Sequence, residues 1–119
     1  MKPTKTHEVK IFIGSVNEVT KNPFTEKDLT KAIQEFQEKN NCKITVRITK
    51  TNFVSGLSYF EKGWEIGAIN YPRFFVNISQ INKFMISLGS ELLSRFKQKR
   101  VSVVTPSKTI VLENSYESN

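Results

Sequence analysis

The sequence predicts an α+β domain in which two helices cover one face of an antiparallel sheet. Short segments that alternate apolar and polar residues are typical of strands, whereas two longer segments repeat their apolar residues at helical spacing. These segments follow one another in the order β-α-β-β-α-β, with a short extra strand at the end. A chain of 119 residues is long enough for one domain with its own core.

The first predicted strand lies in the stretch EVKIFIGSV, residues 8–16, and ends at Gly14, since a polar loop follows from Ser15. Side chains alternate between the two faces of a strand, so Val9 and Ile13 share one face, and Lys10 and Phe12 share the other. We expect the apolar face to pack against the helices. Phe12 is therefore predicted to point to the open face of the sheet.

The first predicted helix lies within residues 24–41. Thr25 and Asp28 have the spacing of a capping box, and the pair Asn40 and Asn41 ends the helical pattern. The buried stripe is expected to consist of Leu29, Ala32, Ile33 and Phe36.

The next two strands are predicted over residues 42–50 and 64–78, joined by an extension and a turn near residues 60–63. Pro72 cannot donate a hydrogen bond to a neighbouring strand, so we expect a bulge or a two-part strand there. The inward residues of the first of these strands are expected to be Ile44, Val46 and Ile48.

A second helix is predicted from Ser79, as its N-cap, to about Gln98. Gly89 within it is less favourable than Ala by ~1 kcal/mol, which indicates the close approach of a neighbouring element. Residues 100–113 predict two short strands around a turn at Pro106. The buried stripe of the helix is expected to consist of Ile81, Phe84, Met85, Leu88, Leu92, Leu93 and Phe96.

This order of elements is the split βαβ, or ferredoxin-like, arrangement: a two-layer sandwich, here with a short extra C-terminal strand. Residues 8–113 are expected to form the single domain, residues 1–7 a flexible basic arm and residues 114–119 a disordered tail. The first and third strands would occupy the middle of the sheet. The sheet face opposite the helices would stay open unless a partner covers it.

The formal net charge of +7 favours anionic partners such as nucleic acid, phosphorylated small molecules or an acidic protein. The charge is also segregated along the chain. Acidic residues gather on the first predicted helix, while residues 39–60 and 92–112 contain none. This segregation supports a binding role for the basic segments.

The residue types that most often carry catalysis are scarce. His7, Asp28 and Cys42 are the single histidine, aspartate and cysteine of the chain, and no glycine-rich phosphate loop is present. The chain is therefore predicted not to be an enzyme, and no cofactor or metal is expected. A third hypothesis, a small-molecule enzyme at a dimer interface, would depend on Glu65 and Tyr71.

The cellular location is predicted to be cytoplasmic, with no membrane association. No apolar run approaches the ~18–20 residues that a membrane span needs. The N-terminal segment lacks the apolar core of a secretory signal, and a lone cysteine gives no disulfide framework.

The candidate binding residues combine the open sheet face with the basic end of the second helix. Aromatic rings stack on bases and cations contact phosphates in single-stranded nucleic acid. The same apolar face would equally suit a protein partner or a second copy of the chain. The candidates are Lys10, Phe12, Lys43, Arg47, Tyr71, Arg73, Phe75, Arg95, Lys97, Lys99 and Arg100.

The segments KIFIGSV and FTEKDL resemble the first strand and the first-helix entry of RNA-recognition motif domains. This resemblance implies binding of single-stranded RNA or DNA on the open sheet face. It covers the first half of the chain only. The segment GWEIGAINYPRFFV does not match the second signature of that family.

The whole chain resembles small accessory proteins of phages and prophages. The resemblance rests on the short length, the FIG of the first strand, the capped helix, the long hairpin and the helix running through RFKQKRVSVV. It implies a host-interaction or anti-defence role, in which the protein blocks a host protein or sequesters a nucleotide signal. No functional residue is carried over from it.

These observations together predict a non-catalytic binding or regulatory module that forms a homodimer or higher oligomer. Its partner would be a host protein or a small anionic ligand such as a nucleotide. The alternative prediction is a single-stranded nucleic-acid-binding domain.

Overall fold

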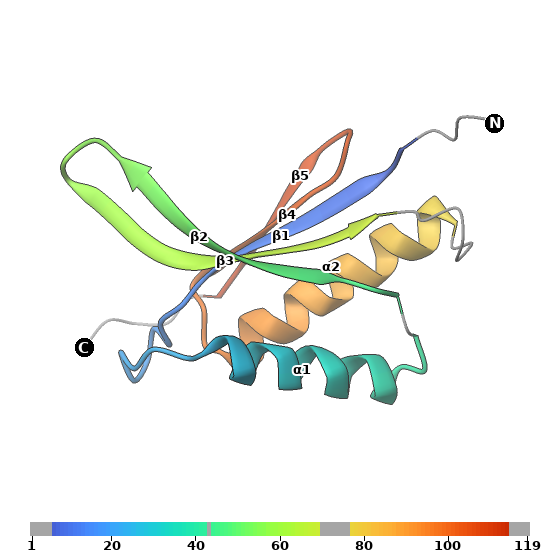
Figure 1. Ribbon diagram of the computed structural model, residues 1–119, viewed down its shortest axis with the longest axis horizontal. Coiled ribbons are helices and arrows are strands. Elements are labelled where there is room, and N and C mark those ends of the chain that lie inside the picture. Colours follow the sequence, from blue (N-terminus) through green and yellow to red (C-terminus); the bar gives the residue numbers. More distant parts are fainter. Residues whose placement is uncertain (1–5, 43, 70–76, 115–119) are drawn as a thin grey trace.

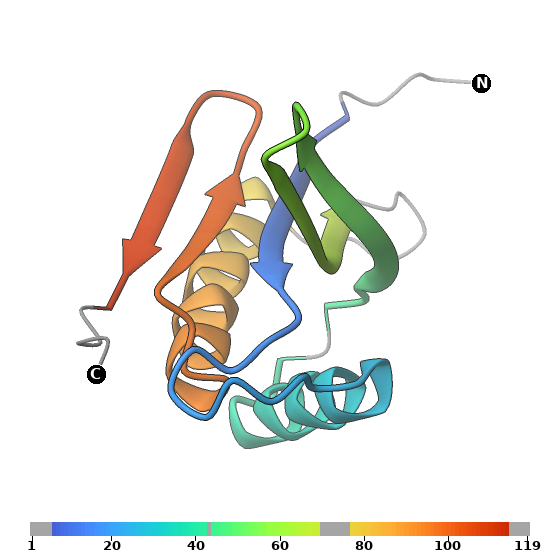
Figure 2. The same ribbon diagram turned by 90° about the vertical axis from the view of Figure 1, so that its left-hand side faces the viewer.

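The computed structural model describes residues 6–42, 44–69 and 77–114. It contains one five-stranded antiparallel sheet with the strand order β2-β3-β1-β4-β5. Both helices lie on the same side of this sheet (Figure 1 and Figure 2). The elements are β1 (Glu8–Gly14), α1 (Glu26–Lys39), β2 (Arg47–Ser55), β3 (Tyr59–Ile69), α2 (Ile78–Arg95), β4 (Arg100–Val104) and β5 (Thr109–Glu113).

The predicted ferredoxin-like two-layer fold with an extra C-terminal strand is confirmed. β1 lies in the centre of the sheet between β3 and β4, as the element order requires. The apolar faces of β1 and β3 point toward the helices and form the core of the domain. Their buried residues are Val9, Ile11, Ile13, Trp64, Ile66 and Ala68.

Helix α1 begins with the predicted capping box. The Thr25 hydroxyl accepts a hydrogen bond from the backbone N–H of Asp28 at 3.1 Å, and the Asp28 carboxylate accepts one from the backbone N–H of Thr25 at 2.9 Å. The second of these bonds holds the pKa of Asp28 below its usual value. The helix buries Leu29, Ala32 and Ile33, as its apolar spacing predicts.

Helix α2 carries the predicted buried stripe, but its ends differ from the prediction. The N-cap is Asn77 in place of Ser79, because the Asn77 side chain accepts from the backbone N–H of Gln80 at 2.9 Å. The helix ends at Arg95, three residues before Gln98. The close approach expected at Gly89 is confirmed, since a Cβ there would lie 3.0 Å from Cγ2 of Val103.

The β2–β3 hairpin turns earlier than the sequence predicts. The turn lies at residues 56–58, where Gly56 has a φ of +63°, and the second strand of the hairpin begins at Tyr59. Glu61 therefore lies within a strand. The bulge predicted at Pro72 falls outside the described residues.

No helix among the described residues is long and apolar enough to cross a bilayer.

The capping box predicts a measurable stability effect. Replacing Thr25 with Ala removes one hydrogen bond at the start of α1 and should lower the free energy of unfolding by about 1 kcal/mol. Thr30→Ala, in the middle of the same helix, is the matched control. Urea denaturation should show a loss for Thr25→Ala only. Equal stability of the two variants would contradict the assigned cap.

Candidate functional site

The open face of the sheet carries a hollow of about 280 Å³ near the C-terminal end of β1. We call it the open-face hollow. Strands β1, β2, β3 and β4 and the loops that flank β1 and β4 all contribute to it. Its lining residues are Phe12, Ile13, Gly14, Glu18, Phe53, Tyr59, Glu61, Gln98, Lys99, Arg100 and Ser102.

Two acceptor oxygens meet above Gly14 in this hollow. A Cβ at Gly14 would overlap Oε1 of Glu61 and would lie 3.3 Å from Oε1 of Gln98, so a larger residue there would displace the Glu61 carboxylate. The Gln98 amide is fixed because its Nε2 donates to the backbone oxygens of Val16 and Phe96 at 2.8 and 3.0 Å. Its carbonyl oxygen is thereby turned into the hollow. This pair of oxygens is suited to a cationic group.

Aromatic rings form one wall of the hollow. Phe12 and Phe53 make an edge-to-face contact with ring centroids 6.2 Å apart. The hydroxyl of Tyr59 donates a hydrogen bond to the Glu61 carboxylate, and this bond raises the pKa of Tyr59 above its usual value. A cation beside Glu61 would therefore also lie near π-electron faces, which attract positive charge.

Cations line the opposite rim of the hollow. Lys99 lies 4.0 Å from Glu18, a loose pairing in which the Lys99 side chain is about half exposed. Arg100 pairs through Nε with Glu113 on β5 at 3.2 Å. The hollow thus has the Glu61 carboxylate on one side and, on the other, two cations that are each paired with a carboxylate.

The sequence-predicted residues divide into groups. Phe12, Lys99 and Arg100 meet in the open-face hollow. Lys10 and Arg47 lie on the same sheet face but outside the hollow. The remaining predicted residues of the open face, Lys43, Tyr71, Arg73 and Phe75, lie outside the described residues.

Lys10 and Arg47 form a chain of ion pairs with acidic neighbours. Lys10 lies 3.0 Å from Glu65 and 3.6 Å from Glu8, and Arg47 lies 2.5 Å from Glu8. The bond from Arg47 lowers the pKa of Glu8, and the bond to Glu65 raises that of Lys10. These carboxylates offset much of the positive charge predicted for this face.

The basic end of the second helix does not form one patch. Arg95 pairs with Glu35 of α1 at 2.6 Å and so links the two helices. Lys97 is exposed in the connection to β4 with a φ of 51°. Neither residue lines the open-face hollow, whereas Lys99 and Arg100 do.

Sequence reasoning missed the central residues of the hollow: Glu18, Phe53, Tyr59, Glu61 and Gln98. The predicted turn near residues 60–63 includes Glu61 and would place its side chain in the turn. The true turn at Gly56 places Tyr59 and Glu61 on β3, on the same face as Phe12. The signal that could have found them is Gly56 itself, as a turn residue.

Groups of three or more His, Cys, Asp or Glu side chains that could hold a metal ion do not occur within the described residues.

Comparison with known proteins gives a structural likeness and no sequence family. No family model and no curated protein matches the chain. Two solved structures share its fold: a phage SAM lyase in complex with S-methyl-5′-thioadenosine and a phage SAM lyase in the apo state. The first is 16% identical, with a TM-score of 0.71 over 95% of this chain and 93% of that chain. The second is 18% identical, with a TM-score of 0.74 over 94% of this chain and 92% of that chain.

This likeness corrects the functional prediction. The expectation of a non-catalytic binding module is wrong, because the solved structures that share the fold over nearly the whole chain are those of an enzyme. The expected likeness to phage proteins is confirmed at the level of fold. The comparisons do not support the resemblance to RNA-recognition motif domains.

The hydrogen bond between Tyr59 and Glu61 predicts a titration effect. In the Glu61→Gln variant the neighbouring negative charge is lost, so the pKa of Tyr59 should fall toward its usual value. Carbon-13 labelling of the tyrosine ring, followed by NMR over alkaline pH, would report it. Glu26→Gln, on α1, is the matched control and should leave the Tyr59 titration unchanged. A Tyr59 pKa that does not move in Glu61→Gln would contradict the contact.

Proposed function

We propose that this protein is a lyase that cleaves S-adenosylmethionine, and that the open-face hollow holds the sulfonium and amino-acid end of the substrate. The observation that carries the proposal is the position of the Glu61 and Gln98 oxygens above Gly14, beside the Phe12–Phe53 wall. The fold shared with a phage SAM lyase supports it.

The charges of the hollow match those of the substrate. A sulfonium group carries a permanent positive charge, which the Glu61 carboxylate and the aromatic rings would attract. The amino-acid carboxylate would face the cations Lys99 and Arg100 on the opposite rim. A hollow of about 280 Å³ lies just below the usual size of a small-molecule site, so the adenine ring would extend beyond it.

The reaction requires one bond to break. Release of S-methyl-5′-thioadenosine breaks the bond between the sulfonium sulfur and Cγ of the methionine chain, and the bonding pair leaves with sulfur as a neutral thioether. Cγ then either bonds to an oxygen of the substrate's own carboxylate, which forms a lactone, or shares a double bond with Cβ after a base removes a Cβ proton. The leaving group needs no proton in either case, so a site without histidine can serve.

The aromatic wall would favour the lactone route. An anionic oxygen that attacks carbon beside a cationic sulfur neutralises charge in the transition state. Phe12 and Phe53 solvate separated charges poorly, so such a step would be favoured along this wall, while charged and polar side chains line the rest of the hollow. Glu61 would hold the sulfonium in place and would act as base in the elimination route, because Glu18, the other carboxylate of the hollow, is paired with Lys21 and Lys99.

Such an activity would agree with the anti-defence role that the resemblance to phage proteins implies. A phage protein that removes S-adenosylmethionine deprives SAM-dependent enzymes of the host of their methyl donor. Because this metabolite is found in the cytoplasm, the proposal also retains the predicted cytoplasmic location.

The proposal predicts production of S-methyl-5′-thioadenosine from S-adenosylmethionine by the purified chain. Glu61→Gln should lower kcat/KM at least about tenfold, which corresponds to ~1.4 kcal/mol of lost transition-state stabilisation. Glu26→Gln is the matched control. Mass spectrometry of the reaction mixture gives both rate and product.

Product formation that does not exceed that of the heat-denatured protein would contradict the proposed activity. Full activity of Glu61→Gln would contradict the assigned site while leaving the activity in place.

Association of several copies of the chain also stays a proposal. The tip of the β2–β3 hairpin extends beyond the helices (Figure 1) and exposes apolar side chains, with Val54 66% and Phe60 60% accessible and Leu57 fully so. Such a cluster is typical of an interface. Light scattering should show an oligomer for the native chain and a smaller species for Phe60→Glu. A monomeric native chain would contradict the proposed association.

A further inference from the structure

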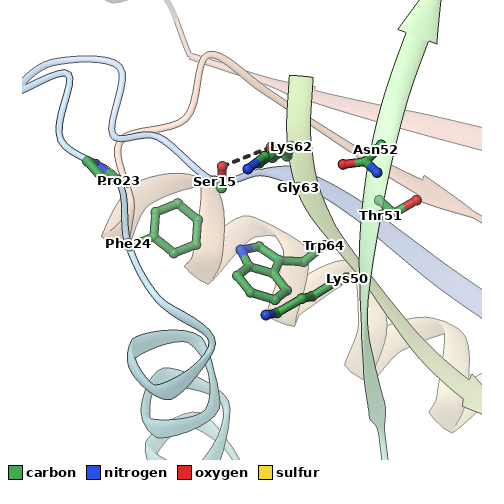
Figure 3. A pocket seen from close by; sticks show the side chains of 9 residues that line it. All are labelled: Ser15, Pro23, Phe24, Lys50, Thr51, Asn52, Lys62, Gly63 and Trp64. Atoms are coloured by element: carbon green, nitrogen blue, oxygen red, sulfur yellow. Dashed lines mark hydrogen bonds between the residues drawn. The ribbon is translucent and has the colours of Figure 1, made fainter. Parts of the chain in front are cut away.

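A second hollow lies on the helix-facing side of the sheet, where the proposed reaction makes no use of it. It measures about 470 Å³ and lies between the loop that precedes α1 and the β2–β3 hairpin (Figure 3). This volume is within the usual range of small-molecule sites. We call it the helix-side hollow. The lining residues that matter for its chemistry are Ser15, Phe24, Lys50, Lys62 and Trp64.

Trp64 supplies a buried hydrogen-bond donor without a partner. The residue is only 6% exposed, and its Nε1 has no acceptor among the residues that the structure describes. A buried donor left unpaired destabilises the folded state. Figure 3 shows the indole at the hollow, with its nitrogen on the side toward Phe24. Because Nε1 itself is closed off from solvent, an acceptor atom of a ligand in the hollow would reach this donor once the side chains around it move apart.

The charge of the hollow is positive. Lys50 and Lys62 line it, and no acidic residue does. Neither lysine forms an ion pair with any described residue. This distinguishes them from Lys10, Arg47, Arg95 and Arg100, which are all paired with carboxylates. The helix-side hollow therefore offers two ammonium groups to an anion.

The apolar wall of the hollow is a fixed aromatic surface. Phe24 is 8% exposed and stacks on Phe96 of the α2–β4 connection, with ring centroids 4.1 Å apart and an interplanar angle of 20°. Together with the Trp64 indole it presents flat aromatic surface to the interior of the hollow. A planar ring packs favourably against such a surface.

We propose that the helix-side hollow is a second ligand site, which binds a small planar aromatic anion. The ring would lie against Phe24 and Trp64, an acceptor atom would receive the indole N–H, and the anionic group would lie between Lys50 and Lys62. The site is separate from the open-face hollow. Glu61 and Lys62 are consecutive residues of β3, so their side chains point to opposite faces of the sheet.

The chain provides its own reporter for this site, because Trp64 is its only tryptophan. Tryptophan fluorescence of the full chain would be followed during titration with adenosine 5′-monophosphate and with benzoate. Adenosine and benzamide are the uncharged counterparts of these two probes. We expect at least one anion to give a saturable change, with at least about tenfold weaker binding of its uncharged counterpart.

Variants separate this site from the proposed catalytic one. Lys50→Gln and Lys62→Gln should each weaken binding of the anion at least about threefold. The exposed Lys108→Gln and the open-face Glu61→Gln should not. Trp64→Phe, measured by calorimetry, should also weaken binding because it removes the donor.

Three results would overturn the proposal: no saturable change with either anion, equal binding of the uncharged counterparts, or unchanged affinity in both lysine variants. Loss of binding in Glu61→Gln would assign the ligand to the open-face hollow and would equally overturn it. None of these results bears on cleavage of S-adenosylmethionine, which is measured separately.

Discussion

The antiparallel pairing of β1 with β3 is the contact on which the rest of the structure depends. Its register sets Gly14 opposite Gly63 and Ile13 opposite Trp64. Because the side-chain period of a strand is two, this register sends Trp64 to the core and Glu61 to the open face. A shift by one residue would exchange the two faces of β3 and bury a carboxylate in place of an indole.

The same register gives the two faces of the sheet opposite chemical character. The open-face hollow gathers Glu61 and the fixed oxygen of Gln98, and the helix-side hollow gathers Lys62 and the Trp64 donor. A cationic ligand group suits the first hollow and an anionic one the second. The net charge of +7 therefore says little about the proposed active site, where the deciding groups are acceptors.

The sequence predicts the elements well where the local signals are strong, and it fails where tertiary contacts decide. The capping box of Thr25 and the apolar stripe of α2 follow from spacing alone. The proposed role of Glu61 does not follow from spacing, since it depends on the turn at Gly56 and on the space above Gly14. Catalysis was discounted because histidine and cysteine are scarce, but loss of a neutral thioether from a sulfonium requires no proton donor.

The most direct test of the central claim is a crystal structure of the chain with S-methyl-5′-thioadenosine bound. The account predicts that the thioether sulfur lies in the open-face hollow, within contact of Glu61 and the Phe12–Phe53 wall. The assigned site would be contradicted if the ligand binds in the helix-side hollow alone, or if its sulfur lies remote from Glu61.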